Sequence, residues 1–346
     1  MRKAKLLSAL AFAALLVIVA FIFVARGVPG AATPQPQNAP AAPSPPPAGC
    51  GNLTVYVLNV SQADSIFIIT PGNKTILIDS GSKMKPDSSS NALAFLAKMN
   101  VTKIDYLVAS HYHEDHIGGM DGIFKSFQVG GIYENGNCGG MTTDVAKKFR
   151  AYVALDGSTV VRNPVDIPSD GCLSEAKLIF PYNQKNGCSK DNENDNSILL
   201  HLVYGNTSFL FTGDCDADCE AAVLQQGVSL KSDFLKVGHH GSDTSSTGPF
   251  LDAVGAEYYV ISADRARSVT DGYFHPREAT LEKLYRRSPN GVFRTDLNGD
   301  VKAVSDGSGI SITPDVASGE CDIFKGYASA DAGSYSLIPQ LSGKCY

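Results

Sequence analysis

Beyond residue 50 the chain alternates short apolar runs with polar or glycine-containing turns, a pattern typical of β-strands. These runs predict strands over 52–59, 64–70, 74–79, 103–109, 197–204, 207–212, 232–237, 257–262, 292–295, 300–304 and 309–312. Helices are predicted over 88–99, where serines provide an N-cap, and over 216–226 and 277–287. Because strands dominate each half, we expect an α/β fold in which two packed sheets are covered by helices, a four-layer αββα sandwich.

The stretch 131–195 departs from this pattern because it is rich in Gly, Asn, Pro and Cys. We expect it to be an irregular insertion held by disulfides. Residues 315–346, which include Cys321 and Cys345, read as a short C-terminal tail. The pattern therefore places one globular domain over 50–314.

The N-terminus has the composition of a membrane segment. Arg2, Lys3 and Lys5 precede an uncharged apolar stretch over 6–25, which matches the roughly 20 residues that span a bilayer. A cleavable signal peptide has a core of about 7–15 residues followed by a small-residue cleavage site. Residues 1–26 therefore predict an uncleaved signal anchor, with secretion after cleavage as the alternative. The basic flank places the rest of the chain outside the cytoplasm.

A Pro/Ala-rich linker over 27–49 follows this segment, and its composition does not support a packed core. The sequence has eight cysteines and no C-x-x-C pair. An even count in an oxidising compartment favours disulfides over a cysteine metal site.

Charge limits the class of partner. The formal net charge is −6, and the first 49 residues contribute four positive charges and no negative one, so the remainder carries −10. Two bound divalent ions would return that value to about −6. Proteins that grip long duplexes through phosphates are usually basic. Any nucleic-acid contact is therefore expected to be confined to a local site.

Six of the seven histidines fall in three short motifs, which points to metal chemistry. The first motif is His111-Tyr-His-Glu-Asp-His116, and the others are His239-His240 and His275, with Asp214 ending an apolar run between them. Imidazole nitrogens and carboxylate oxygens together suit borderline divalent ions such as Zn²⁺. The seventh, His201, lies within an apolar strand, and we expect it to be a core residue.

These motifs resemble the metallo-β-lactamase superfamily, whose first motif is matched by Asp79 in Thr75-Ile-Leu-Ile-Asp-Ser-Gly81. A closer resemblance, covering nearly all of 53–313, is to the soluble hydrolase domain of competence proteins of the ComEC/Rec2 type. It rests on five segments: Val60-Ser-Gln-Ala-Asp-Ser65, Asn194-Asp-Asn-Ser197, Leu235-Lys-Val-Gly-His-His-Gly-Ser242, Phe274-His-Pro276 and Phe293-Arg-Thr-Asp-Leu-Asn-Gly299. The loop over 59–64 retains Gln62 and Asp64 of the family motif but loses one carboxylate and two glycines.

The resemblance implies two divalent metal ions, Zn²⁺ or Mn²⁺, and a set of ligands. His111 and His113 would hold the first ion, while Asp115, His116 and His275 would hold the second. Asp214 would bridge them and Asp79 would orient the metal loop. The superfamily usually supplies a further histidine to the first ion, but Asn194-Asp-Asn-Ser197 occupies that place here. This substitution is why Mn²⁺ is as suitable as Zn²⁺.

Catalytic roles are assigned to Asp115, His240 and His239. Histidines between the bridging aspartate and the last metal ligand assist the phosphate or leaving group in related phosphodiesterases. We favour His240 for this role because Gly241-Ser242 beside it offers donors to a phosphate, and His239 is the alternative. Asn196 and Ser242 are expected to contact substrate.

The sequence thus predicts an extracytoplasmic, membrane-anchored phosphodiesterase or nuclease acting on DNA or another phosphodiester. The first alternative is a hydrolase of a small substrate, such as a lactam, a lactone or a phosphorylated head group, because one fold hosts many activities. The second is a surface binding module that retains only a vestige of the metal site.

Overall fold

Two β-sheets pack face to face in the computed structural model, which describes residues 46–317 except 86, 156–158, 162–165, 183–186, 265–271 and 273. The first sheet has the strand order β14-β13-β1-β2-β3-β4-β5-β6. Its strands are β1 (Leu53–Val57), β2 (Ile66–Ile69), β3 (Thr75–Ile78), β4 (Lys103–Val108), β5 (Gln128–Tyr133), β6 (Thr159–Val161), β13 (Val301–Ser305) and β14 (Ile310–Pro314).

The second sheet has six strands in the order β12-β11-β10-β9-β8-β7. They are β7 (Glu175–Ile179), β8 (Leu199–Tyr204), β9 (Thr207–Phe211), β10 (Phe234–Lys236), β11 (Tyr258–Ile261) and β12 (Val292–Arg294). Successive side chains point to opposite faces of each strand, so one set packs between the sheets and the other packs against the covering helices. In β9, for example, Phe209 and Phe211 face the other sheet, whereas Leu210 faces the covering helices.

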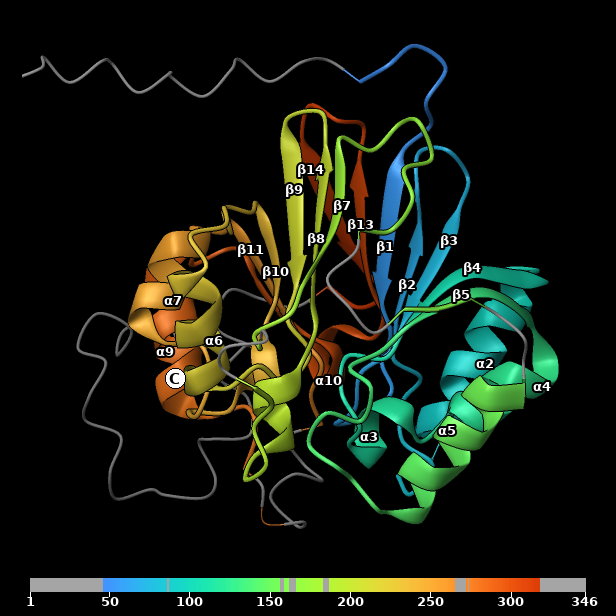
Figure 1. Cartoon of the computed structure of the whole chain (residues 1–346). Helices are drawn as coiled ribbons and strands as arrows, with labels where there is room; N and C mark the ends of the chain where they lie inside the picture. Colours follow the sequence, from blue (N-terminus) through green and yellow to red (C-terminus); the bar gives the residue numbers. More distant parts are fainter. Residues whose placement is uncertain are drawn as a thin grey trace, which may run out of the picture. The chain divides into compact units, whose positions relative to one another are not determined.

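Helices cover the outer face of each sheet (Figure 1). The first sheet is covered by α2 (Ser88–Lys98), α4 (Met120–Ser126) and α5 (Asp144–Leu155). The second is covered by α6 (Ala217–Gln225), α7 (Gly248–Val254) and α9 (Glu278–Arg287). Short helices at loop positions are α3 (Glu114–Ile117) and α10 (Thr295–Asn298), with 3-10 turns η1 (Glu193–Asn196) and η2 (Gly238–Gly241). The predicted αββα sandwich is confirmed.

Strand direction decides where the functional loops meet. β3, β4, β5 and β6 run parallel in the first sheet, as do β9, β10, β11 and β12 in the second. Ligands in such sheets bind beyond the carboxyl ends of parallel strands. Asp79 follows β3, His111 follows β4, Asp214 follows β9 and His239 follows β10. The two sheets therefore bring the predicted site residues to a common edge.

The prediction that 131–195 is irregular was wrong, although the Cys138–Cys188 disulfide does lie within this stretch. This stretch contains the end of β5, helix α5, and strands β6 and β7, so it carries the chain from the first sheet to the second. Helix α5 buries Ala146, Phe149 and Val153 at helical spacing. Polar and glycine-rich connections on both sides concealed this short amphipathic segment.

Six cysteines lie in disulfides among the described residues: Cys50–Cys172, Cys138–Cys188 and Cys215–Cys219. The predicted anchor over 1–26, most of the linker over 27–49, and Cys321 and Cys345 of the tail lie outside the described residues. Within the part that the structure describes, no helix has both the length and the apolar character needed to cross a bilayer.

The junction between α6 and α7 contains a buried carboxylate, Glu220, which accepts hydrogen bonds from the backbone N–H groups of Ser246 (2.6 Å) and Thr247 (2.9 Å). Burial raises the pKa of Glu220 from 4.5 to about 7, against the lowering effect of these hydrogen bonds. Since the folded-state pKa lies above the unfolded value, its stabilising contribution is complete below about pH 4.5 and is lost as pH rises through 7.

We expect the Glu220→Gln variant to lose this pH dependence. The wild-type free energy of unfolding should fall by up to roughly 3 kcal/mol more than that of the variant between pH 4.5 and 8. Urea denaturation at several pH values checks this, and parallel pH curves for the two proteins would contradict it.

Candidate metal centre

The bridging candidate, Asp214, lies at the centre of the histidine motifs. It follows β9 and is buried. Its Oδ2 atom lies within 4.0 Å of the Nε2 atoms of four histidines: 3.2 Å from His116, 3.7 Å from His240, 3.9 Å from His239 and 4.0 Å from His111. Four imidazole nitrogens turned toward one carboxylate oxygen form the donor set of a metal centre rather than of a packed core.

The first motif follows β4 and enters helix α3. His111 is fully buried, and its Nε2 lies 2.9 Å from Nδ1 of His113. Burial, together with the neighbouring His116 and His113, holds the pKa of His111 well below its usual value. His111 is therefore neutral, which is the form that binds metal.

Asp79 sets the orientation of His116. Its Oδ2 accepts a hydrogen bond from His116 Nδ1 (2.7 Å), and its Oδ1 accepts one from the Ser110 backbone N–H (2.8 Å). With Nδ1 engaged, Nε2 of His116 is directed at Asp214. Burial opposes charge on His116, but the carboxylates of Asp214 and Asp79 outweigh it and raise the pKa of His116 well above its usual value. Metal binding is therefore expected to release this proton.

Two further observations indicate that these residues suit divalent ions. Three groups of described residues place their ligand atoms within 4.8 Å of one another: His111, His116 and Asp214; Asp115, His116 and His240; and Asp64, Asp79 and His116. Asp214 Oδ1 and His240 Nε2 are buried and have no hydrogen-bond partner among the described residues. Buried polar atoms without partners are costly unless something else satisfies them, and a bound cation would do so here.

The two downstream motifs lie in the same pocket as the first one. His240 is buried, and its Nδ1 contacts the carbonyl oxygen of Ser262 (3.1 Å), while its Nε2 lies 3.5 Å from Asp115 Oδ2. His275, assigned above to the second ion, lines this pocket with its ring 5.2 Å from the ring of His239. Burial, with the nearby His240 and His239, lowers the pKa of His275 to about 3.

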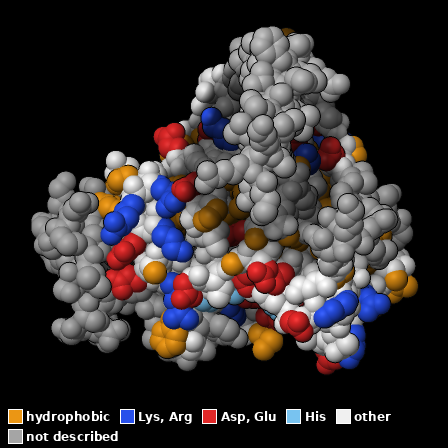
Figure 2. All heavy atoms as spheres, turned by 60° about the vertical axis from the view of Figure 1, so that its left-hand side comes forward, with side chains coloured by type: hydrophobic (Ala, Val, Ile, Leu, Met, Phe, Trp, Pro, Cys, Tyr) orange, Lys and Arg blue, Asp and Glu red, His pale blue; other side chains and the backbone are white. Residues whose placement is uncertain are grey.

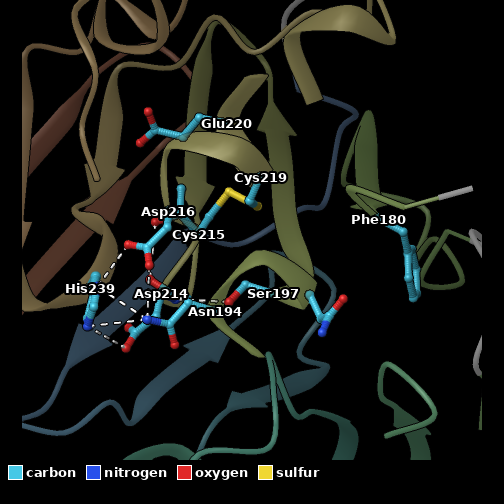
Figure 3. Close-up of a disulfide and its surroundings, with 12 residues drawn as sticks. Phe180, Asn194, Ser197, Asp214, Cys215, Asp216, Cys219, Glu220 and His239 are labelled. Atoms are coloured by element: carbon cyan, nitrogen blue, oxygen red, sulfur yellow. Dashed lines mark hydrogen bonds and ion pairs between the residues drawn. A yellow bond between two sulfur atoms is a disulfide. The ribbon is translucent and has the colours of Figure 1, made fainter. Parts of the chain in front are cut away.

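His239 and His240 both adopt left-handed backbone conformations, with φ of 47° and 52°, and both turn Nε2 toward Asp214. Such values are uncommon for residues other than glycine and mark functional strain. His239 Nδ1 lies 2.9 Å from Asp216 Oδ1, and its Nε2 faces Asp214 (Figure 3). Sequence reasoning missed Asp216, although its place two residues after Asp214 was the available signal.

Two predicted substrate contacts are not supported. Asn196 is fully buried, and its side chain bonds to Ser189 and Glu193 within its own loop. Ser242 is also buried, with its hydroxyl 2.9 Å from that of Thr244. Both side chains satisfy neighbouring loop atoms. Asn194, in the same motif as Asn196, is the residue that reaches the pocket.

The centre opens into a pocket of about 550 Å³. In Figure 2 the histidine side chains lie in a hollow of the surface, with acidic and basic side chains beside them. The lining contains six of the predicted site residues and five others: His113, Asp115, Asp214, His239, His240 and His275, then Gln62, Met84, Lys85, Glu114 and Asn194. His201 is outside this lining and bonds to Glu175 in the second sheet, as expected of a core residue.

Two networks that sequence reasoning missed support the centre. Glu193 accepts hydrogen bonds from the backbone N–H of Tyr112 and from Asn135, and so holds the loop between His111 and His113. Asp64 and Lys236 form a fully buried ion pair of 2.9 Å. Asp64 and Lys236 both stood in motifs that were singled out, but nothing in the sequence indicated that they pair.

Fold and site together define a metal-dependent hydrolase of the αββα class. Residues 58–263 match the family described as the metallo-beta-lactamase superfamily. This chain belongs to that superfamily.

Its relatives include competence proteins. The chain is 26% identical over 262 residues to ComE operon protein 3 of Bacillus subtilis (strain 168), covering 72% of this chain and 32% of that protein. It is 31% identical over 246 residues to competence protein ComA of Neisseria gonorrhoeae, covering 71% and 31%. The chain thus spans about a third of the length of the curated relatives it matches. Among solved structures, a diphosphatase from the PhnP family has a TM-score of 0.40 at 15% identity, covering 73% of this chain and 98% of that one.

Proposed function

We propose that this domain is a metal-dependent phosphodiesterase that cleaves DNA or a related phosphodiester outside the cytoplasm. The observation that carries the proposal is the position of Asp214 Oδ2 between four imidazole Nε2 atoms, with the Asp216–His239 pair beside it. Its relatives named as competence and recombination proteins support DNA as the substrate class.

The geometry favours a revised division of roles. His111, His113 and Asp214 would hold one ion, and Asp115, His116, His240 and Asp214 the other. Two divalent ions at such a site, Zn²⁺ or Mn²⁺, would supply the nucleophile and stabilise the attacking and leaving oxygens of an in-line displacement. The side chains named here hold their ligand atoms in place through contacts such as Asp79 with His116 and the Ser262 carbonyl with His240.

His239 has the geometry of the proton donor. Asp216 accepts from Nδ1, which leaves Nε2 turned to the pocket, where a leaving-group oxygen could take its proton. Thr244 (2.5 Å) and Asn194 (3.2 Å) donate to the Asp216 carboxylate and fix its position. His240, by contrast, has the geometry of a ligand, because its Nδ1 contacts the Ser262 carbonyl oxygen while its buried Nε2, 3.5 Å from Asp115 Oδ2, has no hydrogen-bond partner among the described residues.

The membrane anchor over 1–26 belongs to the same proposal. Its basic flank and apolar stretch would hold the domain on the outer side of the membrane, where disulfides persist. Secretion after cleavage would place the same activity in the same compartment.

A small-substrate hydrolase is the second candidate, and the charge of −10 beyond residue 49 favours it because a long DNA duplex would be repelled. One experiment separates the two. Purified protein loaded with Mn²⁺ or Zn²⁺ is assayed against linear DNA, bis-p-nitrophenyl phosphate and nitrocefin. Cleavage of nitrocefin alone would reject the phosphodiesterase.

Substitution of His239 by glutamine is expected to lower turnover of DNA by about 10²–10⁴-fold while both ions are retained, because general acid assistance is worth this much. The loss should be smaller on bis-p-nitrophenyl phosphate, whose leaving group needs little protonation. Asp216→Asn should reproduce part of the effect.

Two neighbouring histidines are the controls. His240→Gln should lose metal by elemental analysis, whereas His275→Gln should retain it. Metal loss in His275→Gln with retention in His240→Gln would restore the division of roles that the sequence predicted.

A further inference from the structure

One part of the pocket lining has no role in the metal centre. It consists of Gln62, from the loop before β2, and Met84 and Lys85, from the loop before α2. Gln62 is buried, and its Oε1 has no hydrogen-bond partner among the described residues. Lys85 is the single lysine or arginine among the residues that line the pocket in the described part of the chain.

The loop carrying Lys85 is built by a residue of the metal motif itself. Glu114, between His113 and Asp115, accepts hydrogen bonds from the Ser82 hydroxyl (2.6 Å), the Lys83 N–H (2.7 Å) and the Met84 N–H (3.0 Å). The Ser82 hydroxyl in turn accepts from the Lys85 N–H (3.0 Å). These hydrogen bonds fix the backbone of Lys85 relative to the metal ligands.

The ammonium group of Lys85 is held at the pocket. Its Nζ donates to the carbonyl oxygen of Gln62 and lies 3.9 Å from Asp115 Oδ2. The side chain is only 15% exposed, so water screens its charge less than that of a surface lysine. An ammonium carries three donors, and the Gln62 carbonyl engages one of them.

We propose that Lys85 binds a non-bridging oxygen of the substrate phosphate and so makes the pocket selective for anionic phosphodiesters over uncharged esters. This inference rests on the proposed function and names the group that recognises its substrate. The carboxylates of Asp115 and Asp214 repel a phosphodiester anion, and Lys85 is the protein cation placed to offset that repulsion. Glu114 acts as a positioning residue for it.

The test compares Lys85→Met with Lys83→Met in metal-loaded protein. Lys83 lies on the same loop, but its Nζ pairs with Asp121 (2.7 Å) and its side chain is 56% exposed, so its removal changes the net charge equally outside the pocket. Lys85→Met should raise KM for bis-p-nitrophenyl phosphate about 10- to 100-fold with a smaller change in kcat. Lys83→Met should match wild type, and Lys85→Arg should recover part of the loss.

Binding of dimethyl phosphate, measured by titration calorimetry, provides a readout independent of turnover. Lys85→Met should weaken it by a similar factor while metal content and melting temperature stay unchanged. Equal affinity in Lys85→Met and wild type would overturn the inference, as would metal loss in Lys85→Met with unchanged KM, because Lys85 would then serve only Asp115. A wild-type protein that binds dimethyl phosphate through Lys85 yet cleaves no phosphodiester would reject the proposed function alone.

Discussion

Replacing Asp214 with alanine is expected to remove most of the bound metal and to lower phosphodiesterase activity by on the order of 10³-fold or more, since metal ions contribute several kcal/mol of transition-state stabilisation. One carboxylate oxygen faces the Nε2 atoms of His111, His116, His239 and His240, so its loss affects both ligand groups at once. Elemental analysis of gently purified protein gives the metal content, and the DNA assay gives the activity.

The matched control is Asp218→Ala. Asp218 lies in the first turn of α6, four residues after Asp214, and its side chain is exposed. The Asp218→Ala variant should retain metal and activity at wild-type levels. Wild-type protein that takes up no metal on addition of Zn²⁺ or Mn²⁺ would refute the metal centre itself.

The fold was predictable because most strands are short apolar runs between turn residues, and their ranges in the structure differ from the expected ones by a few residues at the ends. The prediction that 131–195 is irregular failed for a physical reason. Helix α5 buries only three side chains, Ala146, Phe149 and Val153, between charged and polar positions. Its contacts come from the neighbouring sheet and helices rather than from a strong pattern of its own.

The first metal motif was predictable because six consecutive residues from His111 to His116 carry it within one loop. The roles proposed for the downstream histidines were not, because they depend on contacts made in the left-handed turn: Nδ1 of His239 meets Asp216, and Nδ1 of His240 meets the Ser262 carbonyl oxygen. Sequence spacing cannot give those contacts. The sequence analysis assigned His275 to the second ion and His240 to the leaving group, whereas the 3.5 Å separation of His240 Nε2 from Asp115 Oδ2 underlies the proposed exchange that makes His240 a ligand.

Side chains that act through tertiary contact were hidden for the same reason. Asp216, Lys85 and Lys236 are separated in sequence from the residues they serve, and their meaning depends on loops meeting at the sheet edge. Glu114 is the instructive case. It lies between the expected ligands His113 and Asp115 and was given no role from the sequence, yet its carboxylate organises the loop over 82–85.

The buried ion pair between Lys236 and Asp64 joins the two sheets at their shared edge. Lys236 ends β10 in the second sheet, and Asp64 precedes β2 in the first. Both side chains are fully buried, with Nζ 2.9 Å from Oδ2 and a further hydrogen bond from Nζ to the Val237 carbonyl (3.0 Å). Removing one member of such a pair leaves the other charge buried without compensation.

We therefore expect Lys236→Met to lower the free energy of unfolding by about 3–5 kcal/mol. Urea denaturation of metal-free protein with its disulfides intact measures this without a contribution from bound ions. The double variant Lys236→Met/Asp64→Asn should recover much of the loss, because it removes the stranded carboxylate as well. Lys103→Met removes a pair with Asp105 in which Lys103 is half exposed, and it should cost much less than Lys236→Met. If Lys236→Met costs no more than Lys103→Met, the pair contributes nothing beyond a surface contact, and the two sheets are held at this edge by apolar packing alone.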